Sequence, residues 1–368
     1  MIKKLSIYLL LIAGIIISSC DKEDDDNTAN VTEQKQLLTT ESANVKNDLD
    51  EIIETEGVVA VTSLIDLFDL VDPFEGDNLK SFKIKTRDFS LKLRSLITSD
   101  VLKNATIGED GSFNFSEHTG TYTWNFTSQN WDIQLDTPND KIIIHFPTEG
   151  STSNNATATL HKFEEQMFID EGDTLYMPTE IEADLYINDT KYIEVDFSAT
   201  WNDEGIPTSI NITVYINPFT FAVSMTDNGT SIDASASLKK GSETIMAVGG
   251  TVTFTNADKE NVTTVDGYVQ YRDVKVAGDV DVASLDALEG EDEPTVAQMN
   301  QYINLAVYQV STGVKIGDIE FFENIEDGET FIDVRIVFAD GTTVLASVYF
   351  DPILQSIEDF LDENFPDW

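Results

Sequence analysis

The chain has 368 residues and a formal net charge of -45 at pH 7, from 67 acidic side chains against 22 lysines and arginines. Such a surface repels nucleic acid and anionic lipid headgroups, because binding to either depends on Lys and Arg displacing counterions. We therefore expect no nucleic-acid partner. Hydrophobic residues make up 41% of the chain and aromatic residues 10%, too many for a disordered polyanion. At this length we expect one large or two modest domains.

The first 20 residues have the order of a secretory signal peptide. Lys3 and Lys4 are followed by an uncharged, mostly apolar run from Ile7 to Ile17 and by small residues before Cys20. The run is shorter than the roughly 20 apolar residues that a membrane-spanning helix needs. Cys20 is also the only cysteine of the chain. The sequence therefore predicts a secretory signal peptide at the start of the chain.

The residues around Cys20 resemble two known signals. Ile17-Ser18-Ser19-Cys20 resembles the lipobox of bacterial lipoproteins, in which the leader is cut off and the cysteine sulfur carries lipid. The acidic run after it resembles the surface-export signal of lipoproteins from the Bacteroidota. The resemblance implies lipid such as palmitate on Cys20, an outer-membrane location facing outward, and an export signal formed by Asp21, Lys22, Glu23, Asp24, Asp25 and Asp26. A lipidated Cys20 excludes thiolate nucleophiles and Cys-ligated zinc or iron–sulfur clusters.

The rest of the chain divides into segments with different patterns. Apolar residues at helical spacing, such as Leu64, Leu67 and Phe68, predict helices early in the chain. A basic strip at residues 80–103 is interpreted as a face that pairs with the acid excess, with an anion site as the alternative. The predicted segments are a signal peptide at 1–19, an acidic flexible tether at 20–32, a helical N-terminal region at 33–104, an antiparallel β-sheet domain at 105–289 and a C-terminal α/β segment at 295–368.

Hydrophobic and polar residues alternate through the central segment. The pattern is clearest at residues 181–187 and 193–201, and it predicts antiparallel strands that are apolar on one face and wet on the other. Turn sequences such as Asn228-Gly229 and Asp266-Gly267 predict hairpins, so consecutive strands should be neighbours in a meander. The apolar phase slips at Gly249-Gly250, which predicts a β-bulge there.

The C-terminal segment mixes both patterns. We expect a helix at 296–307, strands at 315–322, 331–338 and 343–350, and an amphipathic helix after Asp351-Pro352. The expected fold class is α+β and β-dominated: a long antiparallel meander sheet, with a curved half-barrel as one form, whose apolar face is covered by N- and C-terminal helices. This outline resembles the half-barrel lipoprotein carriers. The patterns leave open whether the C-terminal strands form a separate domain or join the main sheet.

The sequence offers no catalytic signature. It contains no His-Glu-x-x-His, no Gly-x-Ser-x-Gly, no Walker A loop and no dinucleotide fingerprint after a strand, so no catalytic residue is assigned. Alternation places His145 and His161 on the polar face, where they could share a metal if their strands are neighbours, although surface histidines are the simpler interpretation. No cofactor is expected. Structural calcium stays an alternative in so acidic a chain, without any Asp-x-Asp-x-Asp-Gly loop to support it.

Two further features point to sugars. Tyr186, Tyr192 and Tyr215 occupy polar-phase positions on three successive predicted strands, and exposed aromatic rings in a row can stack on the apolar faces of a glycan. The alternative is that they stabilise the sheet as cross-strand pairs. Asp173-Thr174-Leu175 resembles the short O-glycosylation sites of the Bacteroidota, which makes Thr174 a candidate for modification.

These observations favour a non-enzymatic binding or interaction protein, anchored by lipid at the outer-membrane surface. Its expected partners are the membrane, through the N-terminal lipid, and a glycan, a hydrophobic ligand or another envelope protein. One alternative is a carrier that holds a lipid in a curved half-barrel. Another is a surface polysaccharide hydrolase, which would need two carboxylates at the spacing used by glycosidases.

Overall fold

The computed structural model describes residues 30–42, 47–48, 51–52, 54–71, 73, 113–170, 173–288, 294–326 and 329–364. Cys20, the acidic run 21–26 and the basic strip 80–103 lie outside the described residues. The predictions made for them therefore stay predictions.

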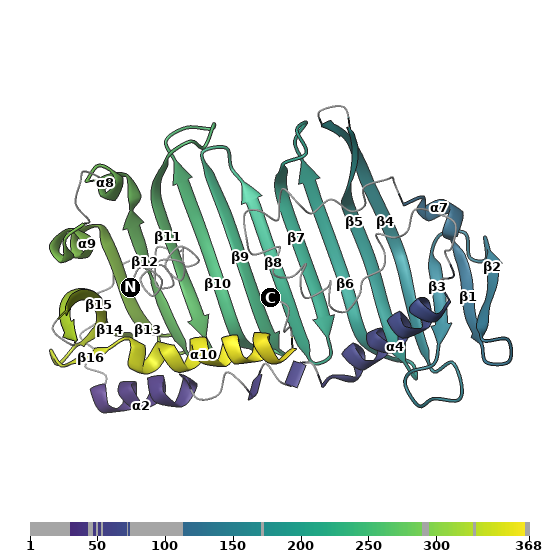
Figure 1. The fold of residues 1–368 in the computed structure, drawn as a ribbon, viewed down its shortest axis with the longest axis horizontal. Coiled ribbons are helices and arrows are strands. Elements are labelled where there is room, and N and C mark those ends of the chain that lie inside the picture. The colour runs from purple at the N-terminus through teal and green to yellow at the C-terminus, as the bar shows by residue number, and fades with distance from the viewer. Residues whose placement is uncertain are drawn as a thin grey trace. The chain divides into compact units, whose positions relative to one another are not determined.

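The fold is β-dominated, with 55% of the residues in strands. Sixteen strands form one open, mostly antiparallel sheet (Figure 1). Neighbours in the sheet follow chain order from β16 down to β3, and β1 then lies between β3 and β2. The pairing of β1 with β3 is parallel. This confirms the predicted fold class, and it shows that the C-terminal strands join the main sheet.

The strands are long in the middle of the chain and short at both ends of the sheet. Their bounds are β1 Gly120–Asn125, β2 Asn130–Leu135, β3 Ile142–Phe146, β4 Ala156–Asp170, β5 Asp173–Ile187, β6 Thr190–Trp201, β7 Pro207–Ile216, β8 Phe219–Asp227, β9 Ser231–Lys240, β10 Glu243–Phe254, β11 Val262–Tyr271, β12 Val274–Asp281, β13 Ile303–Gln309, β14 Lys315–Glu326, β15 Glu329–Phe338 and β16 Thr343–Leu345. The helices are α2 Val31–Ser42, α4 Glu56–Leu70, α7 Phe115–His118, α8 Val282–Asp286, α9 Val296–Tyr302 and α10 Ser347–Asn364.

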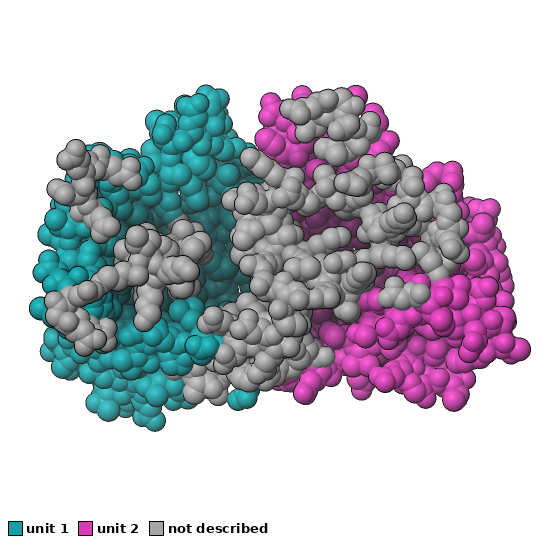
Figure 2. Space-filling view, viewed as in Figure 1, with its two compact units in different colours: residues 1–49, 224–360 teal, residues 50–223, 361–368 magenta. Residues whose placement is uncertain are grey.

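The chain divides into two compact units, drawn in different colours in Figure 2. Unit 1 comprises residues 1–49 and 224–360, and unit 2 comprises residues 50–223 and 361–368. Each unit is described by itself below.

Helices cover one face of the strands of unit 1. Leu38 of α2 and Tyr349 of α10 are buried in one cluster with strand residues such as Val276 and Val307. A second cluster joins Met299 of α9 to neighbouring strands. Helix α9 begins with a capping box, in which the Thr295 hydroxyl and the Gln298 side chain satisfy each other's backbone N–H groups. Burial of the apolar strand face under these helices is what the one-sided alternation requires.

Unit 2 buries its apolar face against α4. The core contains Trp124 and Trp131, whose rings meet edge to face at 5.3 Å between centroids. The Trp131 indole N–H donates to the Val71 carbonyl at 2.8 Å, which fixes the chain just after α4. Tyr122 is 1% exposed and donates to the His118 carbonyl at 2.9 Å, and burial raises the pKa of its phenol to about 12.

Four local predictions were wrong. The helix expected at 296–307 ends at Tyr302, and the chain continues as β13, because Ile303 and its alternate neighbours are buried as strand residues. The strand expected at 343–350 ends at Leu345, and the helix expected after Asp351-Pro352 begins earlier, at Ser347, with Pro352 inside its first turns. No register shift occurs at Gly249-Gly250; the strand pairings of β10 shift near Ile245 and near Phe254 instead.

Candidate functional site

The three tyrosines predicted to form one row do not share a face. Leu185 pairs with Ile193 and Tyr186 pairs with Lys191, so Tyr192 is the extra residue of a bulge between β5 and β6. Tyr192 packs against the core cluster under α4 and hydrogen bonds to the Glu56 carboxylate, which raises the pKa of the phenol. The predicted row is therefore wrong for Tyr192, because the bulge reverses the alternation at that point.

The other predicted residues of unit 2 are more dispersed than the sequence suggested. The Lys191 ammonium lies 5.9 Å from the centre of the Tyr186 ring and pairs with the Glu194 carboxylate at 2.7 Å. Tyr215 stands across the strands from Glu194. Glycan stacking at Tyr186 or Tyr215 stays a prediction. Thr174 lies in β5, and its side chain is outside the described part of the chain.

The two histidines singled out from the sequence have separate partners. His145 Nδ1 lies 3.0 Å from the Thr157 hydroxyl, whereas His161 Nε2 lies 2.8 Å from the Asp184 carboxylate. Burial lowers the pKa of His145. Within the described residues, no group of three or more His, Cys, Asp or Glu side chains is placed to hold a metal ion. Structural calcium therefore stays a prediction without a site.

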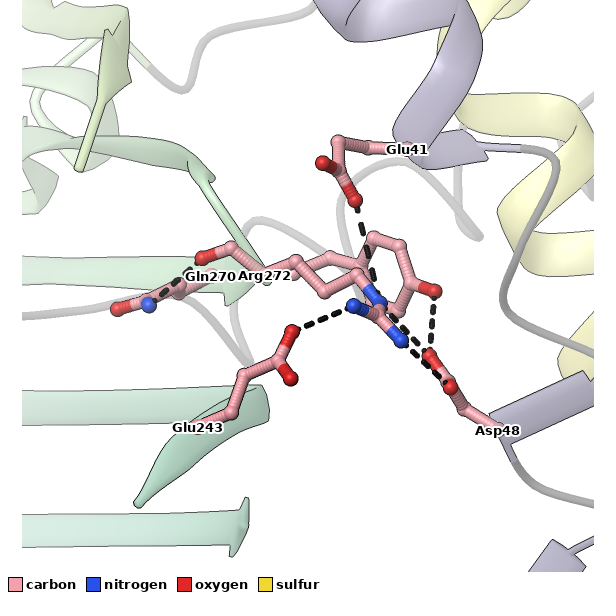
Figure 3. A network of polar contacts seen from close by, with 6 residues as sticks. Glu41, Asp48, Glu243, Gln270 and Arg272 are labelled. Atoms are coloured by element: carbon pink, nitrogen blue, oxygen red, sulfur yellow. Dashed lines mark hydrogen bonds and ion pairs between the residues drawn. The ribbon is translucent and has the colours of Figure 1, made fainter. Parts of the chain in front are cut away.

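A network of polar contacts in unit 1 centres on Arg272 (Figure 3). Arg272 is in the turn between β11 and β12, and its Nε and Nη2 donate to the two oxygens of Asp48 at 2.8 and 2.7 Å. The Tyr271 hydroxyl donates to the same carboxylate at 2.9 Å. Arg272 also pairs with Glu243, and Glu41 lies 3.9 Å from its Nε. We call these five residues the Arg272 clasp.

The contacts of the Arg272 clasp are of the kind that stabilise a fold. A bidentate pairing of guanidinium and carboxylate is among the stronger hydrogen-bonded ion pairs, and it raises the pKa of Arg272 further above its usual value. Burial raises the pKa of the Tyr271 phenol and of the Glu41 carboxyl. Asp48 is 7% exposed and accepts from both Arg272 and Tyr271, so it holds the segment after α2 against the sheet.

A different constellation lies on the face of unit 1 that carries its polar side chains, which we call the polar face. Gly249 of β10 stands directly between Ser235 of β9 and Tyr268 of β11. A Cβ atom at residue 249 would lie 2.8 Å from the Tyr268 ring, so the ring occupies space that only glycine leaves free. Beside it is an open depression of about 310 Å³, lined by Ser224, Thr226, Asp233, Ala234, Ser235, Gly249, Gly250 and Tyr268.

Hydrogen bonds hold the polar groups of this depression in place. The hydroxyls of Ser224 and Ser235 lie 2.8 Å apart and share one hydrogen bond. Asp233 accepts from the Thr251 hydroxyl and, at 2.6 Å, from the Asn228 amide. Each of these groups keeps lone pairs for a ligand hydroxyl. The depression thus offers one aromatic wall and several fixed polar groups.

A lysine and a second tyrosine follow Tyr268 on the next two strands. Lys275 of β12 lies with its ammonium 5.7 Å from the centre of the Tyr268 ring and 5.9 Å from that of Tyr308 on β13. Lys275 stands opposite Gln270 on one side and Tyr308 on the other. The polar face therefore carries a line of three side chains beside the open depression: Tyr268 on β11, Lys275 on β12 and Tyr308 on β13.

Carboxylates lie farther along the same strands. Asp266 stands opposite both Thr251 and Asp279, and the Asn304 amide donates to Asp279 at 3.1 Å. Burial, with the neighbouring Asp279 charge as a second cause, raises the pKa of Asp266 above its ordinary 3.8.

This shift fixes the sign of a pH effect. A carboxyl whose pKa is raised on folding contributes stability that is present below the unfolded-state pKa and is lost as the pH rises through the folded-state pKa. We therefore expect Asp266→Asn to raise the urea midpoint slightly at pH 7, and this gain to vanish near pH 3.8.

Asp340 is the matched control with the opposite sign. The hydroxyl of Thr342, with the Thr342 backbone N–H as a second cause, lowers the pKa of the Asp340 carboxyl. Its contribution is present above the unfolded-state pKa and is lost as the pH falls. Asp340→Asn should therefore lower the midpoint at pH 7, and a loss of stability in both variants would contradict the assignment for Asp266.

The sequence pattern did not identify the line on the polar face. Gly249 was interpreted as a bulge, although a glycine inside a strand also signals a close approach of another group. Which group approaches depends on the register of β10 against β11. The alternation of polar and apolar residues could have placed Tyr268 on the polar face, because it is in phase with Asp266 and Gln270.

Comparisons with known proteins assign no family. No family model, curated protein or solved structure matches the chain. Within the described residues, no helix is both long and apolar enough to cross a membrane.

Proposed function

We propose that this protein is a non-enzymatic component of the cell envelope, held at the outer-membrane surface by lipid on Cys20, and that it binds a glycan on the polar face of unit 1. The observation that carries the glycan proposal is the Tyr268 ring beside an open depression lined by hydroxyls and a carboxylate. The anchor rests on the lipobox resemblance around Cys20.

The chemistry of the depression suits a sugar better than an apolar ligand. An aromatic ring gives the C–H face of a pyranose an apolar surface to stack on. Ser224, Ser235 and Asp233 lie beside the ring and can hydrogen bond to the sugar hydroxyls. The volume is near the lower limit of about 300 Å³ for small-molecule sites, and the depression is open. A glycan chain that lies across the polar face fits such an open depression better than a small molecule that must be enclosed.

The test is a single substitution in the full-length protein. Wild-type protein should bind to a subset of an immobilised glycan array, and Tyr268→Ala should weaken that binding by tenfold or more, a loss of about 1.4 kcal/mol. The Tyr268 ring lies over Gly249 and is only partly buried. Its removal should therefore leave the fold, and with it the circular dichroism spectrum, unchanged. Calorimetric titration with the best glycan measures the change.

Tyr186→Ala is the matched control, because Tyr186 is a tyrosine of unit 2 that also has a lysine over its ring. It should bind as wild type does. Loss of binding in Tyr186→Ala with normal binding in Tyr268→Ala would place the site in unit 2. No binding by the wild-type protein to any glycan of the array would contradict the proposal.

One observation favours hydrolysis of the glycan as a second candidate function. Asp266 has a raised pKa and stands directly opposite the more exposed Asp279 on the adjacent strand. Glycosidases use two neighbouring carboxyl groups, and the one that acts as the acid has a raised pKa. Release of reducing ends from a bound glycan by wild-type protein, abolished in Asp266→Asn, would support hydrolysis. Binding without release would leave the non-enzymatic proposal in place.

A further inference from the structure

Lys275 differs from those cations of the described residues that pair with a carboxylate. Arg272 pairs with Asp48, Lys259 pairs with Asp227, and Lys162 pairs with Glu180. For Lys275, no carboxylate oxygen of the described residues lies within 4.0 Å of the ammonium. Within the described residues Lys275 thus lacks the carboxylate partner that these three cations have.

Two tyrosine rings hold this ammonium in place of a carboxylate. Its distances to the ring centres of Tyr268 and Tyr308, 5.7 and 5.9 Å, are within the range of cation–π attraction. The negative ring faces restrain the ammonium, yet they do not neutralise its charge. An ammonium has three N–H donors, so Lys275 retains donors and a full positive charge for a ligand.

The position of Lys275 relates it to the depression. Tyr268 forms a wall of the depression and also contacts Lys275, so a ligand stacked on Tyr268 reaches both. The two are on adjacent strands, which are about 4.8 Å apart. Within this distance, a substituent of a stacked sugar can contact the ammonium.

We infer that the polar face of unit 1 selects glycans that carry an anionic group, a carboxylate or a sulfate ester, and that Lys275 binds this group. The inference rests on the proposed function. Lys275 supplies the charge and the hydrogen bonds, whereas Tyr268 supplies the stacking surface. A charge-assisted hydrogen bond is roughly twice as strong as one between neutral groups, which gives the acidic glycan its advantage.

The net charge of the protein does not oppose this local contact. Asp266 and Asp279 stand four residues along their strands from Gln270 and Lys275, about 13 Å at 3.3 Å per residue. At physiological salt the Debye length is about 8 Å, so exposed charges at that distance are largely screened. The excess of acid instead disfavours nonspecific attraction of polyanions, which leaves the contact with Lys275 as the discriminating one.

The experiment compares two pairs of polysaccharides that differ only in charge. Polygalacturonate and its carboxyl-reduced form test the carboxylate, and dextran sulfate and dextran test the sulfate ester. Full-length wild-type protein should bind the charged member of one pair at least tenfold more tightly, and sodium chloride should weaken that binding. The pair that shows the preference identifies the source of the anionic group.

Variants separate the inference from the proposed function. Lys275→Gln should abolish the preference but retain binding to the neutral member, Lys275→Arg should keep the preference, and Tyr268→Ala should weaken both. Lys191→Gln is the matched control, because Lys191 also lies over a tyrosine ring but is paired with Glu194; it should change nothing.

Two results would overturn the inference and leave glycan binding intact. One is equal binding of the charged and neutral members by wild-type protein. The other is a preference that persists in Lys275→Gln. Failure to bind any of the four polysaccharides would also overturn the inference. The proposed function is decided separately, by binding to the wider glycan array and by its dependence on Tyr268.

Discussion

Replacement of Asp48 by alanine is expected to lower the free energy of unfolding by about 3 kcal/mol. Breaking a buried ion pair from one side costs roughly 3–5 kcal/mol, because the remaining charge loses its partner without regaining water. Asp48 is 7% exposed and accepts three hydrogen bonds, two from Arg272 and one from Tyr271. The Arg272 side chain is 25% exposed, so some water reaches it and the lower end of the range applies.

Urea unfolding of the full-length protein measures this loss. Asp318→Ala is the control, because Asp318 pairs with Lys315 at 2.9 Å while both side chains are more than half exposed; such a pair contributes about 1 kcal/mol or less. Removing the charge on both sides, as Asp48→Ala with Arg272→Met, should recover part of the loss. If Asp48→Ala costs no more than Asp318→Ala, the clasp does not stabilise the fold.

The clasp illustrates what the sequence could not provide. Asp48 and Arg272 are 224 positions apart, and the chain offers 67 acidic side chains as partners for each cation. No spacing rule selects one of them. The pair forms because the segment after α2 and the β11–β12 turn are brought together by the fold, and the fold is decided by the burial of apolar surface elsewhere.

The meander, in contrast, could be predicted. Hydrophobic and polar residues alternate along most of the long strands, so one face of the sheet is apolar. Short turns of Asn, Asp and Gly make consecutive strands pair with each other. The failure at residues 303–307 has a physical reason as well. A short apolar run is compatible with both a helix and a strand, and the pairing of β13 with β12 and β14 decided for the strand.

The candidate site lies between these two cases. Alternation correctly places Tyr268 and Lys275 with the polar residues, because the strand pairing puts both on the same face of the sheet. Tyr192 was misplaced because a single bulged residue reverses the phase. The proximity of Tyr268 to Gly249 follows from register alone. A sequence therefore predicts which face a residue occupies more readily than which neighbours it meets there.

Gly278 and Gly249 should respond differently to the same substitution by alanine. Gly278 of β12 lies opposite Leu305 of β13, and a Cβ atom there would lie 1.8 Å from the Asn304 carbonyl oxygen. The other near atoms are also backbone, so no side-chain rotation relieves the clash. We expect Gly278→Ala to cost about 3 kcal/mol or more, the upper end for overpacking, because β12 and β13 must separate.

Gly249→Ala is the matched control for this prediction. The three atoms nearest to its Cβ would all belong to the Tyr268 side chain, which can move. The free energy of unfolding should therefore change by less than about 1 kcal/mol, while glycan binding falls as it does in Tyr268→Ala. Thermal unfolding and calorimetric titration of both variants measure the two effects. A stable Gly278→Ala would show that the two strands are not held so close. Normal glycan binding by Gly249→Ala would show that the position of the Tyr268 ring over this glycine does not matter, because an added methyl group cannot coexist with the ring as it now lies.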